Sequence, residues 1–141
     1  MNKRDIIIKI VNKWPDIEIV NLYKAGGWWK DHYNPSGLKY LIKGSLAFAI
    51  AFDNNSKKAI GMGRLISDGF SDAYIQDLVV LDEFRNKGIG RRIVKELIEF
   101  CKKKQIHWVG LIAEPNQDRF YENLGFKPLK DYIPMKYENG D

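Results

Sequence analysis

One stretch, residues 77–92, restricts what this chain can fold into more than any other. It runs from an apolar strand at 78–81 through a polar turn and a basic loop with two glycines into an amphipathic helix. The first turn of a helix leaves backbone N–H groups unpaired and carries partial positive charge. The stretch therefore predicts a strand–loop–helix unit that binds an anion, with phosphate as the best fit.

Length and composition predict one domain. A chain of 141 residues is long enough for a core of helices and a sheet, and 45% hydrophobic and 29% charged residues are typical of soluble proteins. No apolar run approaches the roughly 20 residues that span a membrane, and the basic N-terminus lacks the apolar region of a signal peptide. The single cysteine, Cys101, excludes an internal disulfide and a cysteine-rich metal site. We therefore expect a cytoplasmic protein that binds neither membrane nor metal.

Apolar runs and turn signals predict the order of the first elements. An opening strand is expected within residues 5–13, then a helix from Pro15 to the glycines at 26–27, then a short helix that Ser36 caps and Gly44 ends. The three strands that follow are separated by strong turns and are most simply antiparallel. They cover residues 46–52, 59–66 and 74–81.

The helix after the glycine loop has the clearest pattern in the chain. Its apolar residues recur at a spacing of 3.6, so one face must cover a sheet. A buried strand at 108–113 follows, and a right-handed crossover would make it parallel to the strand before the helix. A short helix at 116–124 and one or two strands within 126–137, broken by Pro128 and Pro134, complete the chain. The apolar face consists of Ile89, Ile93, Val94, Leu97, Ile98 and Cys101.

The glycine loop matches neither of the common nucleotide-binding motifs. Ile93 stands where a dinucleotide fingerprint needs its third small residue, and the P-loop spacing is absent. Gly88 and Gly90 could serve a tight turn alone. Four cations around them exceed what a turn requires, so we favour the anion site. These cations are Arg85, Lys87, Arg91 and Arg92.

Residues 85–90 resemble the Arg/Gln-x-x-Gly-x-Gly/Ala signature of the GCN5-related N-acetyltransferase (GNAT) superfamily. Residues 76–80 and 120–126 match two further landmarks of that superfamily, in the same order. The whole match covers about residues 45–137 and implies a small, bacterial-type, single-domain member that spans residues 1–141.

The resemblance also implies the fold. It is an α/β (α+β) fold with a mixed, largely antiparallel sheet of six to seven strands and about four flanking helices. A central β-bulge after residues 78–80 would split the sheet and leave an opening for acetyl-CoA.

The same resemblance implies how acetyl-CoA is held. The backbone of Leu78 and Val80 would pair with the pantetheine arm like an added strand, and N–H groups of residues 87–92 would hold the pyrophosphate. Arg85 would support this loop and the phosphates, and Asn116 would lie against the cofactor arm. The implied cofactor-binding residues are Leu78, Val79, Val80, Arg85, Asn86, Lys87, Gly88, Ile89, Gly90, Arg91, Arg92, Asn116 and Tyr121.

Tyr121 is the implied general acid, because the matching tyrosine of the family protonates the departing CoA thiolate. A phenol with a pKa near 10 is protonated at pH 7, as an acid catalyst must be. The alternative is that Tyr121 only packs with Phe120 and Phe126. The proton acceptor is open between Asp77 and Glu114, either of which could be a structural or a solvated carboxylate, with His32 as a weaker third choice.

Four aromatic residues suggest the acceptor site. The superfamily covers the acceptor side with its first two helices and their loop, and aromatic faces suit an amine-bearing or aromatic acceptor. The alternative is that these rings fasten the two helices to the sheet. The residues are Tyr23, Trp28, Trp29 and Tyr33, and Tyr40 is a further candidate.

The implied activity is transfer of an acetyl group to a primary amine by direct attack on the thioester, with Cys101 buried on a helix face and not acetylated. A small-molecule amine is the first choice and a protein amine the second. A CoA-binding or regulatory module without turnover is a further alternative, but the presence of Tyr121 makes it the less favoured one.

The net charge of +5 suits anions in general. Nucleic acid is not expected, because the aromatic residues lie apart from the basic loop. A homodimer is implied by the resemblance alone.

Overall fold

A computed structural model describes residues 5–140. Residues 1–4 and Asp141 lie outside the described residues. Residues 1–4 begin the N-terminal segment in which no signal peptide is expected. The chain divides into two compact units, residues 1–111 and residues 112–141, and each is described by itself.

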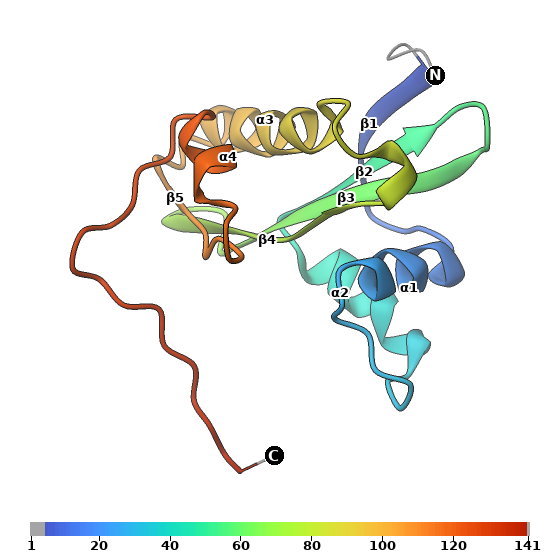
Figure 1. The fold of residues 1–141 in the computed structure, drawn as a ribbon, viewed down its shortest axis with the longest axis horizontal. Helices are drawn as coiled ribbons and strands as arrows, with labels where there is room; N and C mark the ends of the chain where they lie inside the picture. The colour runs from blue at the N-terminus through green and yellow to red at the C-terminus, as the bar shows by residue number, and fades with distance from the viewer. Residues whose placement is uncertain (1–4, 141) are drawn as a thin grey trace. The chain divides into compact units, whose positions relative to one another are not determined.

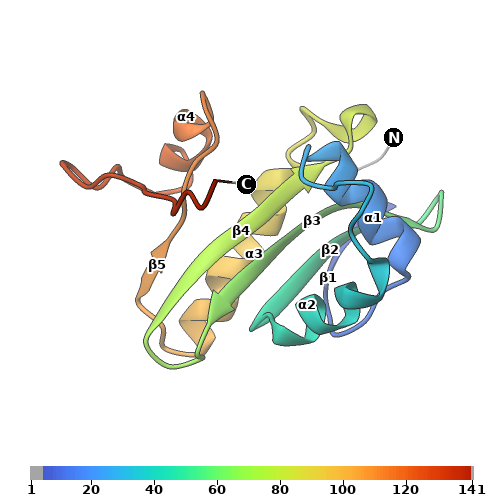
Figure 2. The same cartoon turned by 90° about the horizontal axis from the view of Figure 1, so that it is seen from below.

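The first unit contains a five-stranded sheet whose strands pair in the order in which they occur in the chain (Figures 1 and 2). The first four strands are antiparallel to their neighbours, and the fifth is parallel to the fourth, as the sequence predicts. The strands are β1 (Ile6–Val11), β2 (Ala47–Asp53), β3 (Lys58–Ser67), β4 (Asp72–Val80) and β5 (Trp108–Gly110).

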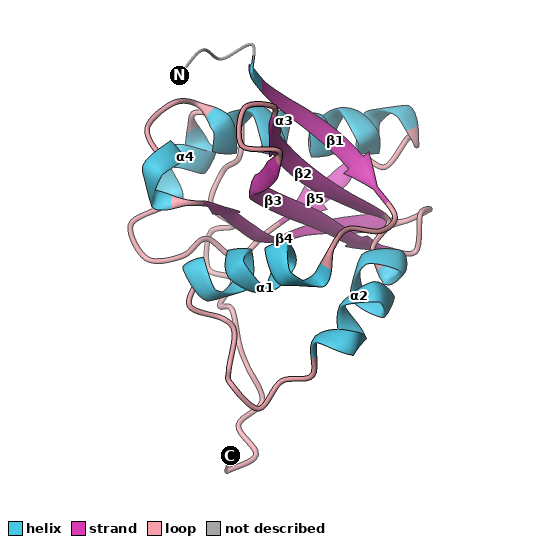
Figure 3. Ribbon diagram, turned by 90° about the vertical axis from the view of Figure 1, so that its right-hand side faces the viewer, coloured by secondary structure: helices cyan, strands magenta, loops and turns pink. Residues whose placement is uncertain are grey.

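Helices cover both faces of this sheet (Figures 1 and 3). α3 (Ile89–Lys103) lies on one face, because its predicted apolar stripe is buried there, and α1 (Asp16–Ala25) and α2 (Leu38–Gly44) lie on the other. Two short 3-10 turns, η2 (Pro35–Gly37) and η3 (Asp82–Phe84), precede α2 and the glycine loop. Within residues 5–140, the helices are all too short or too polar to cross a bilayer.

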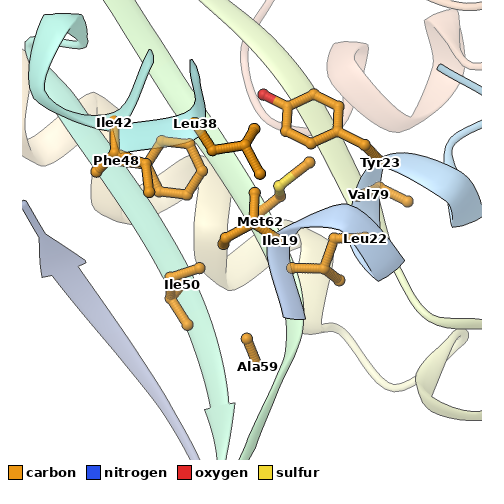
Figure 4. Close-up of a cluster of buried hydrophobic side chains, with 10 residues drawn as sticks. All are labelled: Ile19, Leu22, Tyr23, Leu38, Ile42, Phe48, Ile50, Ala59, Met62 and Val79. Carbon is orange, nitrogen blue, oxygen red and sulfur yellow. The ribbon is translucent and has the colours of Figure 1, made fainter. Parts of the chain in front are cut away.

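The core between the sheet and the α1–α2 layer is a single apolar cluster (Figure 4). Ile19, Leu22 and Tyr23 of α1 pack in it against Phe48 of β2 and Met62 of β3. These residues recur at helical spacing in α1, which explains why the helix forms there and which side it buries.

A β-bulge interrupts the pairing of β3 with β4. Met62 is paired with Val79 and Arg64 with Gln76, so Asp77 and one further residue stand opposite Gly63 alone. Asp77 has the left-handed φ of 60° that such a bulge can require, and aspartate tolerates it better than most residues. The sequence places the bulge after residues 78–80, whereas the structure has it just before Val79. Gly63, which faces the bulge, packs closely against α3, since a Cβ there would lie 3.0 Å from the Ile93 side chain.

The second unit contains one short helix, α4 (Asp118–Glu122). The count of four α-helices agrees with the prediction, whereas residues 5–140 contain five strands rather than six to seven. The missing strands are those expected within 126–137, which form neither helix nor strand. A strand exists only when its backbone pairs with another strand, and Pro128 and Pro134 each remove one donor.

Candidate functional site

An open strand edge lies at the end of β4. β4 pairs with β5 only through Asp72–Tyr74 and Trp108–Gly110, where the three residues of β5 end (Figure 2). Beyond Tyr74, no other strand of the described chain pairs with β4 on this side. The backbone between Ile75 and Val80 can therefore accept an extended, peptide-like ligand. This unpaired segment of β4 includes residues 78–80, beside which the family resemblance implies an opening for acetyl-CoA.

The loop after β4 is fastened to the end of that strand by Arg85. Its Nε donates to the Val80 carbonyl at 2.9 Å, and its guanidinium forms a 2.9 Å ion pair with Asp82. Asn86 and Gly88 have left-handed φ values of 63° and 78°, which asparagine and glycine adopt at low cost. Arg85 thus supports the loop, which is half of its predicted role.

The glycine loop leads into the N-terminus of α3, which no side chain caps. Gly88 is the N-cap of α3, no side chain caps the helix, and its first turn contains no acidic residue. The N–H of Arg92 makes the first helical bond, to the Gly88 carbonyl at 3.1 Å, so the N–H groups of residues 88–91 have no acceptor within the helix. Lys87 and Arg91 are exposed beside them. These groups fit a phosphate.

Among the four cations of the glycine loop, Arg92 forms its side-chain hydrogen bond with β1. Its guanidinium donates to the Ile6 carbonyl of β1 at 2.7 Å, and its N–H belongs to the helix. Its contribution therefore includes holding α3 against β1.

Asp77 lies in a hydrogen-bonded network at the bulge. Its Oδ2 accepts a bond from Arg64 Nε at 2.6 Å and a second from the Tyr23 hydroxyl at 2.8 Å. The Arg64 and Asp77 side chains are only 17% and 20% exposed. Burial, and then the charge of Asp77, hold the pKa of Tyr23 well above its usual range. Oδ1 of Asp77 has no bond to the described residues.

Arg64 is a site residue that sequence reasoning missed. It is the one charged residue within the apolar strand segment 59–66, and this position is the signal that could have identified it. Buried charges are paired, so a lone arginine in such a strand implies a carboxylate partner. Spacing along the chain does not show which carboxylate it is.

The four predicted aromatic residues form a continuous cluster next to Asp77. Tyr23 is part of the buried core, and its ring centroid lies 6.1 Å from that of Trp28 and 6.5 Å from that of Trp29. Both tryptophans are partly buried and pack against the core, and Trp29 contacts Tyr33 at 5.4 Å. Tyr33 is 41% exposed, and the His32 ring contacts it edge-to-face, with centroids 4.9 Å apart. Tyr23 thus helps to fasten α1 to the sheet, which is the alternative role predicted for the aromatic residues. The outer rings, those of Trp29 and Tyr33, remain accessible.

Tyr121 of α4 packs against two phenylalanine rings of the second unit. Its ring packs edge-to-face on Phe120, with centroids 4.9 Å apart, and on Phe126, at 5.8 Å. Burial, together with the charge of Glu114, raises the pKa of Tyr121 above its usual value. Glu114 and Asn116 are exposed in the turn before α4, and Asn116 has a φ of 67°. The phenol is therefore held in its protonated form.

These features agree with a comparison against known protein families. A model of the acetyltransferase (GNAT) domain matches residues 23–138. The chain belongs to the GNAT family. Both the open β4 edge and the glycine loop lie inside the matched segment of this GNAT domain.

Solved structures and curated proteins contain similar GNAT chains. A GNAT-family acetyltransferase from Streptococcus pneumoniae TIGR4 is 30% identical, with a TM-score of 0.79 over 96% of this chain and 99% of that one. The uncharacterized N-acetyltransferase ycf52 of Pyropia yezoensis is 30% identical over 81% of this chain and 64% of that protein. Histone acetyltransferase TAP1 of Glycine max is 34% identical over 52% of this chain and 32% of its own length. This chain thus spans less than two thirds of the curated relatives.

Proposed function

We propose that this GNAT chain is an acetyl-CoA-dependent N-acetyltransferase that acts on a primary amine. The observation that carries the proposal is the open edge of β4 leading directly into the uncapped N-terminus of α3. Acetyl-CoA supplies the acetyl group as a thioester. Its amide-containing pantetheine arm suits the backbone of residues 78–80, and its pyrophosphate suits the N–H groups of residues 88–91 with Lys87 and Arg91 beside them.

We assign Tyr121 the role of proton donor to the departing thiolate. The Oη proton is present at neutral pH, because a phenol has a pKa near 10 and burial raises the pKa of Tyr121 further. The attacking amine must lose a proton, and Glu114 is the carboxylate that we assign to accept it, directly or through water. Asp77 already accepts two hydrogen bonds on one oxygen, so we assign it an anchoring role instead.

Direct transfer, without an acetylated cysteine, is supported by the position of Cys101. This residue is fully buried on the apolar face of α3, and burial raises the pKa of its thiol. A buried, protonated thiol is a poor nucleophile.

We propose a small-molecule amine as the acceptor. The free Oδ1 of Asp77 can bind an ammonium group, and the outer rings of Trp29 and Tyr33 offer faces that attract cations. A protein amine is the second candidate, because the Glycine max relative is named a histone acetyltransferase.

We also propose that both units form one GNAT domain, since the family match extends across both of them. A cytoplasmic location is part of the same proposal.

Release of the CoA thiol from acetyl-CoA tests this function. The purified chain is offered a panel of small primary amines, aromatic and aliphatic, together with a lysine-containing peptide. We expect turnover with a higher kcat/KM on a small amine than on the peptide. Tight acetyl-CoA binding without turnover on any amine would instead identify a CoA-binding module, and preference for the peptide would identify a protein acetyltransferase.

A further inference from the structure

The bulge residue Asp77 has a backbone conformation that its residue type seldom adopts. Its φ of 60° lies in the left-handed region, where residues other than glycine are uncommon. Strain of this kind lasts only where the surrounding contacts hold the residue in place, and it is found most often at functional sites. The contacts that hold Asp77 therefore bear on what the bulge does.

Two hydrogen bonds to one oxygen hold the Asp77 side chain. Arg64 of β3 and Tyr23 of α1 both donate to Oδ2, at 2.6 and 2.8 Å. Arg64 is supported in turn by Ser45, whose Oγ accepts from Nη1 at 3.4 Å and donates to the Leu41 carbonyl of α2 at 2.8 Å. Tyr23 is only 7% exposed, so its hydroxyl has little room to move away from Asp77. The bulge is thus anchored to both helices of the α1–α2 layer, entirely within the first unit.

The conformation of Asp77 sets the direction of the next backbone N–H, which belongs to Leu78. Successive residues of a strand turn their N–H and C=O groups to opposite edges. The Leu81 N–H donates to a β3 carbonyl at 2.9 Å, whereas the Val80 carbonyl faces the other way and accepts from Arg85 Nε. Leu78 lies two residues before Val80, so its N–H also faces the open edge of β4.

The Leu78 N–H adjoins both halves of the proposed reaction centre. It lies on the edge that we propose for the pantetheine arm, and it follows Asp77, whose Oδ1 is proposed to bind the acceptor ammonium. The acetyl carbonyl must lie between the cofactor arm and the attacking amine. This N–H can therefore donate to the carbonyl oxygen as negative charge develops there, and such a donor is effective only when its direction is fixed beforehand.

We propose that Tyr23 and Arg64 are positioning residues for acetyl transfer. Through Asp77 they hold the bulge, and the bulge aims the Leu78 N–H at the acetyl carbonyl. Both residues act through Asp77 and not on the reacting atoms, and this role goes beyond fastening α1 to the sheet. The inference rests on the proposed function, in particular on acetyl-CoA binding at the β4 edge.

Steady-state release of the CoA thiol tests this role in the full chain. Tyr23→Phe keeps the buried ring but removes the hydroxyl, so kcat should fall about tenfold while the KM for acetyl-CoA stays within about twofold. Glu18→Ala is the matched control, because Glu18 fastens α1 to β3 by accepting from the Ala59 N–H at 2.7 Å, without contact to Asp77. It should lower the Tm and leave kcat unchanged. A wild-type kcat in Tyr23→Phe, or an equal loss of kcat in Glu18→Ala, would overturn the inference.

A double variant shows whether the two residues act through the same carboxylate. Arg64→Lys keeps a positive charge beside Asp77 but loses the guanidinium geometry, so it should also lower kcat. Combined with Tyr23→Phe, it should lose less than the product of the two separate losses, because both changes disturb one group. A loss equal to that product would mean that the two residues act independently, which contradicts the inference.

The Leu78 N–H can be observed directly by NMR on protein with isotope-labelled leucine, where its signal is identified by its loss in Leu78→Ile. In wild type, acetyl-CoA should shift this signal further than CoA does, because CoA lacks the carbonyl. In Tyr23→Phe the two ligands should shift it equally. Equal shifts in wild type refute the positioning role even where turnover on amines supports the proposed function. Unequal shifts without turnover on any amine count against the proposed transfer reaction but support the aim of the N–H.

Discussion

Arg64 and Asp77 join β3 to β4 at the bulge, with Arg64 Nε only 2.6 Å from Asp77 Oδ2. The Tyr23 hydroxyl of α1 donates to the same oxygen. One carboxylate oxygen therefore connects β4, whose edge is the proposed acetyl-CoA site, with α1, which lies beside the proposed acceptor site.

Replacing Asp77 should mainly affect stability. Asp77→Asn keeps the shape of the side chain and tolerates the left-handed φ, but leaves the largely buried Arg64 without a counter-charge. We expect unfolding by urea to show a loss of about 2 kcal/mol, less than for a fully buried pair because both side chains retain some solvent contact. The double variant Arg64→Met with Asp77→Asn should recover part of this loss. Native stability combined with a hundredfold lower kcat and an altered pH profile would instead make Asp77 the base.

The buried Tyr23 should make the protein sensitive to alkaline pH. Its pKa is raised in the folded state, so above about pH 10 the unfolded chain releases this proton first and the free energy of unfolding falls. The fall approaches about 1.4 kcal/mol per pH unit between the unfolded and folded pKa values. Below pH 10 the group is protonated in both states and contributes no slope. Urea unfolding from pH 8 to 11 should show this slope in wild type and in Tyr33→Phe, and a smaller slope in Tyr23→Phe.

An added carboxylate at the glycine loop should weaken binding without unfolding the protein. Gly90→Glu puts a negative charge in the first turn of α3, where it favours the helix dipole but competes with the pyrophosphate. Calorimetry should give a Kd for acetyl-CoA at least about tenfold higher, with the Tm unchanged or raised. Gln105→Glu makes the same change of charge just beyond the other end of α3 and should bind normally. An unaltered Kd in Gly90→Glu would place the anion elsewhere.

Removing the Tyr121 hydroxyl should slow the chemical step. Tyr121→Phe keeps the ring contacts with Phe120 and Phe126 but loses the proton, so kcat should fall by about a hundredfold with little change in the KM for the amine. The readout is release of the CoA thiol. Tyr132→Phe removes a hydroxyl from an exposed ring of the same unit and should leave kcat as it is. A kcat in Tyr121→Phe equal to that of wild type would leave Tyr121 with its packing role alone.

Local patterns predict most of the fold and the loop of the candidate site. The stripe of α3 and the glycine loop depend on residues a few positions apart, so periodicity and spacing are sufficient to locate them. The family resemblance adds the open edge at β4, which spacing alone would not indicate.

The sequence does not show the contacts between residues that lie far apart in the chain. Arg64 meets Asp77 across 13 residues, and Tyr23 meets it across 54. The bulge lies at Asp77 and faces Gly63, which packs against α3, and such packing between layers leaves no local pattern in the sequence. The tail of residues 126–137 has the composition of a strand, but whether it pairs depends on an edge that no local pattern describes.

The agreement between strand order and chain order has a consequence for folding kinetics. The pairings of β2 with β3 and of β3 with β4 join strands that are separated only by residues 54–57 and 68–71, so only short loops must close before these three strands pair. The β4 edge and the start of α3 are separated by fewer than ten residues and can form together. Because contacts of this kind form fast, we expect the proposed cofactor half of the site to be complete early. The pairings of β1 with β2 and of β4 with β5 span residues 12–46 and 81–107, so we expect them to form late and to limit the folding rate.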